Sequence, residues 1–598
     1  MIRVRDLKVW FPLRRGMLRE LTGRAALWVR AVDGVSFDIR RGEVYCLVGE
    51  SGCGKTTTGK SLVGLVDATD GDVFLEMPDA AYREYESLVG RPKDATALGA
   101  IDRLRRKYSF TWKESLRWTP IQYALLAAMV GAGFLGSLSL VALVAAYDSG
   151  ALLDAGTTVG LSVIMGVLLG GIAAFPPTRP DRRTASVAAV LAAVGFNILP
   201  MLASWLASAV QAGAPGFDPY ESWAIAWGGN TFGMLIGQVF APAAAGGVAR
   251  VVIGVRQSRG GLMGIKMRTL RRRLHLIFQD PYESLNPKQS VLEIVQEPLR
   301  VNHISSDPGE ITALVRGALE DAGLRPPEEF MFRFPHELSG GQRQRVSIAA
   351  ALVLRPDFIV ADEPVSMLDV SIRTEILQLM LQLREKRDLT YLFITHDLGL
   401  AWILADRVAV MYLGKIVEEG TAEQVIAHPK HPYTQALISV VPSPDPRKKV
   451  ERVILKGERP DPVDIPKGCR FHPRCPVAFE KCGWSSNEIA EELKSLSTAG
   501  VLPGIAQMEA QNPWTVALAV VPGTTPEAFI ETFRRVVKEH RDSQRALKGI
   551  AGVRTRGGYV YVKLHQGSEP RLVELEPGNT VACHLVTSPA EAPHALTA

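Results

Sequence analysis

Four long apolar segments interrupt the first half of this chain. They lie near residues 121–147, 156–175, 185–210 and 223–249, and none of them contains Asp, Glu, Lys or Arg. Each reaches the roughly 20 residues that a helix needs to cross a bilayer. A buried bundle in a water-soluble protein is the alternative, but it rarely needs such lengths without charge. The sequence therefore predicts about four transmembrane helices within an insert at residues 101–265.

Basic side chains flank this insert. Lys and Arg cluster before the first segment and after the last, and the middle turn holds Arg179, Arg182 and Arg183. The other two turns carry only acidic charges. This positive-inside pattern predicts that both ends of the insert face the cytosol. Because no segment contains an ionisable residue, we interpret the insert as an anchor or contact module rather than a translocation pore.

Length and composition bound the rest of the chain. At 598 residues it is too long for a single core, and a net charge of +6 does not by itself indicate a nucleic-acid partner. Residues 1–16 are charged and have no apolar run, so no cleaved signal peptide is expected. We expect the chain to divide as 1–100, 101–265, 266–430 and 431–598.

A phosphate-binding loop precedes the insert. Residues 49–56 read GESGCGKT, between an expected buried strand at 43–48 and an expected helix at 56–65. In this pattern backbone N–H groups cradle phosphates, Lys55 reaches the β- and γ-phosphates, and the Thr56 hydroxyl holds Mg²⁺. The candidate ATP-binding residues are Gly49, Ser51, Gly52, Cys53, Gly54, Lys55, Thr56 and Thr57.

Polar residues that suit nucleotide hydrolysis follow the insert. Asp362 ends an apolar run at 358–361, where a carboxylate can serve Mg²⁺. Glu363 comes next and is the candidate for polarising the attacking water. Gln279 can touch metal and water, and His396, after another apolar run, can contact the γ-phosphate. The candidate catalytic residues are thus Glu363, His396 and Gln279, and the candidate Mg²⁺ ligands are Thr56, Gln279 and Asp362.

The order and wording of these motifs resemble the ATP-binding cassette (ABC) ATPases. Under this resemblance residues 338–342 (LSGGQ) are the family signature, Leu368–Asp369 the D-loop, Gln279 the Q-loop and His396 the switch histidine. It implies an α/β P-loop domain with a RecA-like core, an antiparallel β subdomain and a helical subdomain. Cassettes of this family pair head to tail. Ser339, Gly340, Gly341 and Gln342 should therefore contact ATP on a partner subunit, either a related second ATPase, which we favour, or an identical one.

Longer strings narrow the resemblance to the ATPase subunits of oligopeptide/dipeptide importers. The strings are FQDPYESLNP (278–287), PHEL (335–338), HPYT (431–434), GCRFHPRCP (468–476) and VACHL (581–585). The resemblance covers residues 1–75, 266–484 and about 570–587, and it leaves out the apolar insert. It implies two multi-span permease subunits as partners, fed by an extracellular solute-binding protein, with membrane lipid around the predicted insert.

Cysteines 469, 475, 482 and 583 match the positions where this family places a C-terminal [4Fe–4S] site. Zinc would accept the same four thiolates, and metal-free thiols are a third possibility. Lys467, Arg470 and Arg474 are expected to lower the pKa of these thiols.

Two smaller features complete the predictions. Residues 514–521 and 559–564 are expected strands flanking a helix near 527–540, which together form a small α+β insertion in the C-terminal domain. The family also places an aromatic side chain on adenine, for which Phe11 and Trp28 are both candidates.

The resemblance implies an ATP-hydrolysing subunit that energises an importer for peptides or a similar small solute, at the cell membrane with its ATPase facing the cytosol. A self-contained half-transporter, exporting through its own four segments, is the alternative. A DNA-repair or regulatory cassette is a third reading, which the apolar segments disfavour. The solute itself cannot be named from the sequence.

Overall fold

The computed structural model describes residues 1–13, 27–89, 95–111, 269–441, 452–455, 457–541 and 543–587. All of them belong to one unit of the chain, residues 1–112 and 266–598. The four predicted membrane segments lie outside the described residues. Within the described ranges, no helix is both long enough and apolar enough to cross a bilayer.

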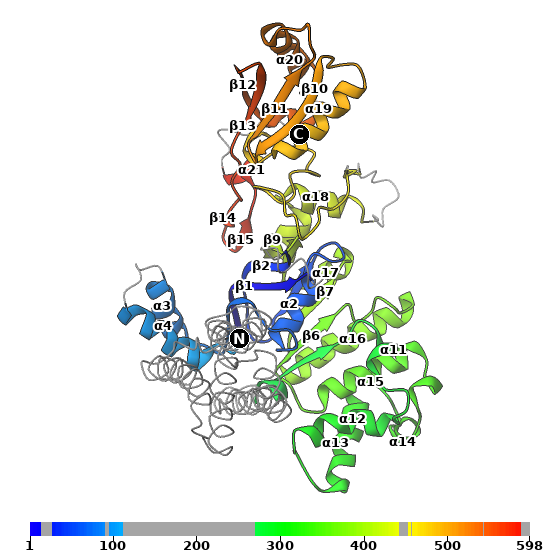
Figure 1. The fold of residues 1–598 in the computed structure, drawn as a ribbon. Coiled ribbons are helices and arrows are strands. Elements are labelled where there is room, and N and C mark those ends of the chain that lie inside the picture. Colours follow the sequence, from blue (N-terminus) through cyan, green and yellow to red (C-terminus); the bar gives the residue numbers. More distant parts are fainter. Residues whose placement is uncertain are drawn as a thin grey trace, which may run out of the picture. The chain divides into compact units, whose positions relative to one another are not determined.

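A central sheet of eight strands organises the fold, in the order β14-β15-β9-β8-β3-β7-β6-β5 (Figure 1). The five strands β8, β3, β7, β6 and β5 run parallel, and β9, β15 and β14 extend the sheet in antiparallel pairing. The bounds are β3 (Val44–Val48), β5 (Leu274–Ile277), β6 (Phe358–Asp362), β7 (Thr390–Thr395), β8 (Arg407–Tyr412), β9 (Lys415–Thr421), β14 (Val573–Glu576) and β15 (Asn579–Val581).

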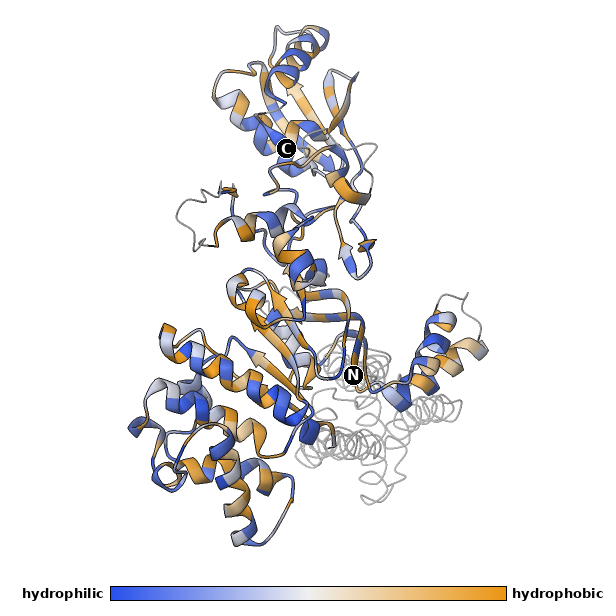
Figure 2. Cartoon of the chain, turned by 180° about the vertical axis from the view of Figure 1, so that it is seen from behind, coloured by the Kyte–Doolittle hydropathy of each residue, from blue (hydrophilic) through white to orange (hydrophobic). Residues whose placement is uncertain are grey.

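Continuous apolar runs explain why the middle strands are parallel and central. Every residue of β3, β6 and β7 is buried, as expected for strands that are covered on both faces. These strands show as hydrophobic in Figure 2. Because their carboxyl ends meet at one edge of the sheet, the residues that follow them are brought together there.

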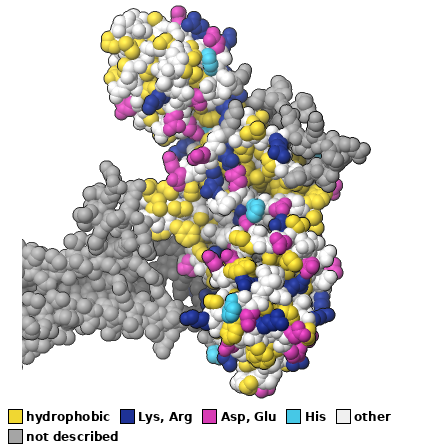
Figure 3. Space-filling view, turned by 90° about the vertical axis from the view of Figure 1, so that its right-hand side faces the viewer, with side chains coloured by type: hydrophobic (Ala, Val, Ile, Leu, Met, Phe, Trp, Pro, Cys, Tyr) yellow, Lys and Arg dark blue, Asp and Glu magenta, His cyan; other side chains and the backbone are white. Residues whose placement is uncertain are grey.

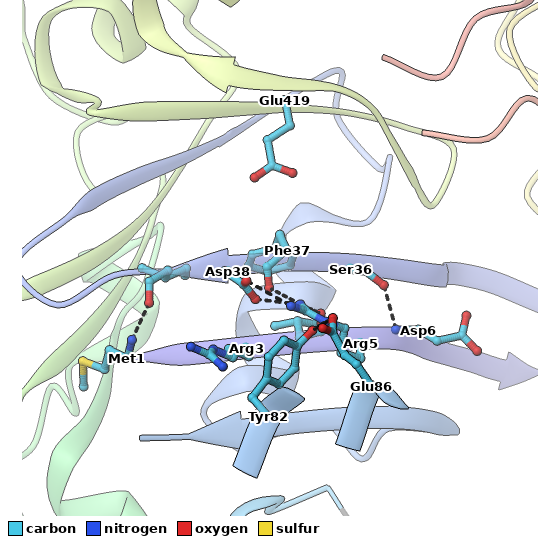
Figure 4. A network of polar contacts seen from close by, with 12 residues as sticks. Met1, Arg3, Arg5, Asp6, Ser36, Phe37, Asp38, Tyr82, Glu86 and Glu419 are labelled. Atoms are coloured by element: carbon cyan, nitrogen blue, oxygen red, sulfur yellow. Dashed lines mark hydrogen bonds and ion pairs between the residues drawn. The ribbon is translucent and has the colours of Figure 1, made fainter. Parts of the chain in front are cut away.

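A second sheet consists of three antiparallel strands in the order β2-β1-β4. Its strands are β1 (Ile2–Pro12), β2 (Trp28–Ile39) and β4 (Asp70–Leu75), followed by α3 (Asp79–Val89) and α4 (Ala95–Tyr108). Arg5 binds the Asp38 carboxylate with two nitrogens, at 2.6 and 2.9 Å, and also contacts the Tyr82 hydroxyl (Figure 4). The arginine thus ties α3 to β1 and β2.

Helices α11 to α15 gather in one group beside α16 in Figure 1. Contacts join α15 to α11, α12, α13 and α16. Besides α3 and α4, the α-helices described before residue 405 are α2 (Lys55–Leu62), α11 (Pro281–Ser284), α12 (Val291–Val301), α13 (Pro308–Asp321), α14 (Glu328–Met331), α15 (Gly340–Leu352), α16 (Val370–Arg387) and α17 (Leu398–Leu404). An antiparallel sheet and a group of helices are thus both present among the described residues.

The C-terminal part begins with α18 (Pro432–Ser439) and continues through the cysteine-containing loop. It then forms a four-stranded antiparallel sheet in the order β10-β11-β13-β12. Its elements are α19 (Ser486–Thr498), β10 (Ile505–Asn512), β11 (Thr515–Val520), α20 (Pro526–His540), β12 (Ile550–Arg556), β13 (Tyr559–Leu564) and α21 (His584–Thr587). The two predicted strands and their helix are present as β11, β13 and α20. The sequence did not predict α19, β10 or β12.

The surface carries charges of both signs. Over the face shown in Figure 3, Lys and Arg side chains stand beside Asp and Glu side chains. This mixture agrees with a net charge of only +6 over 598 residues. In this view no charged patch of one sign dominates the described surface.

Candidate nucleotide-binding site

The phosphate loop lies between β3 and α2, the strand–loop–helix context that the sequence predicted. Gly54 ends the loop with a φ of +110°, and a Cβ at this position would lie 2.1 Å from the Ala31 carbonyl oxygen. Only glycine fits there without a shift of β2. Lys55 is buried, and its Nζ donates to the carbonyl oxygens of Gly49 (2.7 Å) and Glu50 (3.0 Å). The ammonium group therefore sits within the loop, where phosphate oxygens can compete for it.

Thr56 meets Asp362 at the start of α2. The Thr56 hydroxyl donates to Oδ1 of Asp362 at 2.9 Å, although the two residues are 306 positions apart. Burial raises the pKa of the Asp362 carboxyl, while Thr56 and nearby lysines oppose that rise. A hydroxyl and a carboxylate oxygen are the hard donors that Mg²⁺ prefers, so the residues present fit the predicted ion.

The side chains of Gln279 and His396 both contact the carboxylate of Glu363. Gln279 Nε2 donates to Oε2 of Glu363 at 3.1 Å, and His396 Nδ1 lies 3.1 Å from the same oxygen. The Glu363 backbone adopts a φ of +46° and its N–H donates to the Ile394 carbonyl oxygen at 2.9 Å. A left-handed conformation at a residue other than glycine stores strain, of the order of 1–3 kcal/mol, and such strain concentrates at functional sites. All three predicted catalytic side chains thus converge on one oxygen.

The signature residues begin α15. Ser339 is its N-cap and forms a capping box with Gln342: the Ser339 Oγ accepts from the Gln342 N–H, and the Gln342 Oε1 accepts from the Ser339 N–H. Arg343, one residue on, stacks over the Tyr282 ring at 4.1 Å. Ser339 is exposed and Gly340, Gly341 and Gln342 are half-buried, so this helix N-terminus is open to an anion.

All four cysteines of the predicted metal site are buried and line one cavity. Its wall also contains His431, Phe471, His472 and His584. The cysteine loop closes on itself through the Cys469 N–H, which donates to the Cys482 carbonyl oxygen at 2.9 Å. A Cβ at Gly483 would lie 2.4 Å from the Lys467 carbonyl oxygen, so glycine is required at this crossing.

The donor set suits a thiolate-bound metal or cluster, since four cysteines share the cavity. Among the described residues, however, no group of three or more His, Cys, Asp or Glu side chains is arranged to hold a metal ion. The metal therefore stays a prediction.

Two family models match this chain. The ABC transporter model matches residues 32–99 and 248–366, and the model of the oligopeptide/dipeptide transporter C-terminal region matches residues 417–482. The first match stops short of His396, and the second contains three of the four cavity cysteines.

Known proteins of similar sequence support these family matches. A putative peptide import ATP-binding protein of Brucella ovis is 47% identical over 226 residues, which cover 38% of this chain and 70% of that protein. The chain belongs to the ABC transporter ATPases of the oligopeptide/dipeptide importer type. The dipeptide transport ATP-binding protein DppF of Haemophilus influenzae is 49% identical over 36% of this chain and 64% of its own length. The putative oligopeptide transport ATP-binding protein YkfD of Bacillus subtilis is 47% identical over 37% and 67%.

Membership confirms the predicted family, the ABC-type P-loop fold and the ATPase activity. The structure gives this ABC ATPase the geometry for that activity, because the phosphate loop, the Thr56–Asp362 pair and the Glu363 cluster meet at one sheet edge. The match to peptide-import relatives favours the importer over the exporter alternative.

The prediction that Lys467, Arg470 and Arg474 lower the pKa of the cysteine thiols is wrong. Burial raises the pKa of all four, to about 12 for Cys475 and Cys482. Arg470 instead binds Asp33 at 2.5 Å and Glu569 at 2.9 Å, and Arg474 binds Glu50. Carboxylates compensate the charges of Arg470 and Arg474, so these two arginines do little to stabilise a thiolate.

The candidate adenine-stacking residues of this ABC ATPase lie at the end of the β1–β2 ribbon. Phe11 pairs with Val29 and Trp28 pairs with Pro12. Since partners across a pair share a face and successive residues alternate, Phe11 and Trp28 lie on opposite faces of the ribbon. Both side chains are exposed, so both remain candidates.

Sequence reasoning missed the contacts that the C-terminal part makes with the phosphate loop. Arg474, Tyr433 and Arg459 all contact Glu50 or Ser51. The only available signal was the string HPRCP, in which an arginine stands beside a cysteine. Nothing in that string indicates a partner more than 400 residues away.

Proposed function

We propose that this ABC ATPase powers the import of peptides or a similar small solute by a multi-subunit transporter. The relatives that carry the proposal are described as peptide import or oligopeptide and dipeptide transport ATP-binding proteins. ATPases of such importers associate with the membrane at its cytoplasmic face. The partners proposed here are two multi-span permeases, a second ABC ATPase and, indirectly, an extracellular solute-binding protein.

The residue roles follow from the convergence on Glu363, which is the single observation that carries the proposed mechanism. Glu363 accepts the proton of the attacking water, while Gln279 and His396 fix its Oε2 atom from two sides. Thr56 and Asp362 would hold Mg²⁺, and Gln279, which contacts the neighbouring Glu363, is the third proposed ligand. When bound there, the ion would supply positive charge that offsets the charge of the β- and γ-phosphates. Lys55 leaves the two loop carbonyls and binds phosphate oxygens.

Replacing Glu363 with Gln tests this assignment. Glu363→Gln keeps the shape of the side chain but removes the base, so ATP turnover should fall at least 100-fold. MgATP binding should persist. Glu385 is exposed and serves as the matched control, because Glu385→Gln should leave turnover unchanged. Undiminished turnover in Glu363→Gln would remove Glu363 from this role.

The signature residues act on a partner's nucleotide in this proposal. Ser339, Gly340 and Gly341 offer the open N-terminus of α15, and Gln342 fixes that end through the capping box. ATP-dependent dimerisation of Glu363→Gln, measured by light scattering with and without the added change Ser339→Glu, tests it. A carboxylate at this helix end should repel the partner's γ-phosphate and prevent the dimer. A dimer that persists contradicts the assignment.

A cluster or zinc site is proposed for the four-cysteine cavity. Its support is the burial of four thiols around one cavity and the match of this region to the importer C-terminal model. Such a group, when bound, would supply cross-linking of the loop and potential redox sensitivity. Iron, acid-labile sulfide and zinc in the anaerobically purified chain identify it. Cys475→Ser should lose the metal and Cys46→Ser, at a buried cysteine of β3, should keep it.

The insert at 101–265 is proposed as a membrane anchor on sequence grounds alone. In cells without the permeases, the full chain should stay in the membrane pellet after an alkaline carbonate wash. A chain lacking residues 121–249 should be released into the supernatant. Release of the full chain would contradict the proposed anchor. Transport by the chain alone would instead support the alternative hypothesis of a self-contained exporter.

A further inference from the structure

Three contacts from the C-terminal part hold the phosphate loop. The Glu50 N–H donates to the Tyr433 hydroxyl at 3.0 Å. Arg474 binds the Glu50 carboxylate with both terminal nitrogens, at 2.8 and 3.1 Å. Arg459 donates to the Ser51 carbonyl oxygen, and a Cβ at Gly52 would meet its guanidinium. The loop that receives phosphate is thus fixed from outside the P-loop core.

The Arg474–Glu50 pair is the strongest of these contacts. Two parallel hydrogen bonds between a guanidinium and a carboxylate define an orientation as well as a distance. The pair is also partly removed from water, since the side chains are 12% and 29% exposed. Screening by solvent is therefore weaker than for a surface ion pair.

Arg474 is the chain neighbour of a residue that lines the cysteine cavity. It immediately precedes Cys475, whose side chain is buried in that cavity. Because the two residues are adjacent, the cysteine loop fixes the backbone position from which the Arg474 side chain starts. A change in the conformation of the cysteine loop would therefore move the Arg474 backbone relative to Glu50.

A cluster of aromatic rings also connects the cysteine cavity with the phosphate loop. Tyr412, Tyr433 and Phe471 pack ring against ring, with centroids 4.7 Å apart for Tyr412–Tyr433 and 5.2 Å apart for the two pairs with Phe471. Phe471 lines the cysteine cavity, and the Tyr433 hydroxyl holds the Glu50 N–H. Since buried aromatic rings are closely packed, this cluster supports the loop as one unit with the cavity wall.

The position of Glu50 matters for nucleotide binding because its carbonyl oxygen accepts from Lys55 Nζ at 3.0 Å. A loop whose Glu50 is fixed presents Lys55 and the loop N–H groups in one arrangement. Less conformational freedom is then lost when phosphate binds, which strengthens binding.

We propose that Arg474 is a positioning residue of the phosphate loop, and that through it the folded cysteine loop sets the affinity of this ATPase for MgATP. The proposal concerns nucleotide binding and needs no metal in the cavity. It also extends the nucleotide site to a part of the chain that follows His396 by 78 residues.

The test is a double-mutant cycle in the full chain with Arg474→Gln, Glu50→Gln and both together. The dissociation constant for MgATP, measured with a fluorescent ATP analogue, should rise about tenfold in each single variant, because a charge-assisted pair is lost. The double variant should bind no more weakly than the singles. In each variant KM for ATP should rise together with the dissociation constant. The value of kcat should change less than about twofold, since Glu363 is untouched. Unchanged affinity, or effects that add in the double variant, would overturn the proposal.

Two further variants separate positioning from general damage. Arg545 Nη1 donates to the Cys475 carbonyl oxygen at 2.7 Å, so Arg545→Gln perturbs the same loop through a different contact. It should weaken MgATP binding in the same direction as Arg474→Gln, because the loop acts through Arg474, and unchanged affinity in Arg545→Gln would contradict the role of the cysteine loop. Arg474→Lys keeps the charge without the two-pronged geometry, and its affinity should fall between those of the parent and Arg474→Gln. If Arg474→Gln does not fold, Glu50→Gln and Arg474→Lys still decide the outcome.

Discussion

The Nδ1 atom of His396 lies 3.1 Å from Oε2 of Glu363, the same oxygen that accepts from Gln279. His396 follows β7 and Glu363 follows β6, and these two strands are neighbours in the parallel sheet. The sheet therefore places the histidine against the glutamate without any long loop. This relationship ties the side chain proposed to contact the γ-phosphate to the one proposed to take a proton from water.

His396→Ala should lower kcat by about 100-fold, since the glutamate then loses one of the two groups that fix its carboxylate. MgATP binding should change little because the phosphate loop is intact. Steady-state ATPase rates and nucleotide binding on the same preparations check this. His428 is exposed, and His428→Ala is the matched control with unchanged rates. A loss of binding equal to the loss of turnover would contradict the assignment.

Thr56→Val should raise the free Mg²⁺ concentration needed for half-maximal ATPase activity about tenfold or more. The change removes the hydroxyl that bonds to Asp362 at 2.9 Å and that is proposed to bind the ion. Titration of Mg²⁺ at fixed ATP measures the effect. Thr58 offers a control in the same helix, because its buried hydroxyl donates to the Gly54 carbonyl oxygen at 3.0 Å. Thr58→Val should not shift the Mg²⁺ requirement, and a shift equal to that of Thr56→Val would show that any hydroxyl loss in α2 suffices.

The sequence predicted the nucleotide edge of this fold well, and the reason is physical. Three short apolar runs are typical of buried strands, and each is followed by a polar motif: Val44–Val48, Phe358–Asp362 and Thr390–Thr395. Parallel strands bring such motifs to one edge whatever the chain does in between. An insert of more than a hundred residues therefore did not obscure the site.

Contacts between distant side chains were beyond the sequence. Arg5 and Tyr82, or Arg474 and Glu50, are far apart in the chain, and no periodicity marks them as partners. For the same reason the prediction that the neighbouring basic residues lower the pKa of the thiols was wrong. Arginines beside cysteines suggest a lowered thiol pKa, but the sequence does not show which carboxylates compensate the arginines or how deeply the thiols are buried.

Arg105→Ala should destabilise the packing of α3 and α4 by about 1–3 kcal/mol, because a buried carboxylate loses its partly exposed cation but keeps the Tyr85 hydroxyl. Asp72 is buried and accepts from Arg105 Nε and from the Tyr85 hydroxyl, both at 2.8 Å. Amide hydrogen exchange of α3 and α4 reports the local loss. Arg103 is exposed on the same helix, so Arg103→Ala should leave exchange unchanged, and equal effects of the two variants would contradict the pairing.

Acidification should weaken β5 through His275. Burial lowers the pKa of this imidazole to about 4 from an ordinary value of 6.5, although the Arg272 backbone opposes the shift. Protonation therefore favours the unfolded state: the stability that this group confers is complete above pH 6.5 and is lost as the pH falls toward 4. Within that window the loss approaches about 1.4 kcal/mol per pH unit.

The Nε2 atom of His275 is buried with no hydrogen-bond partner among the described residues, so phenylalanine breaks no bond at that atom and loses only the interaction with the Arg272 backbone. His275→Phe should make the stability of the β5–β6 pair less dependent on pH between 6.5 and 4. Hydrogen exchange of the β5 and β6 amides at several pH values, corrected for the intrinsic pH dependence of exchange, measures it. His428→Phe, at an exposed site, should keep the parental slope. A slope that His275→Phe leaves unchanged would mean that the pKa of His275 is the same in the folded and unfolded states.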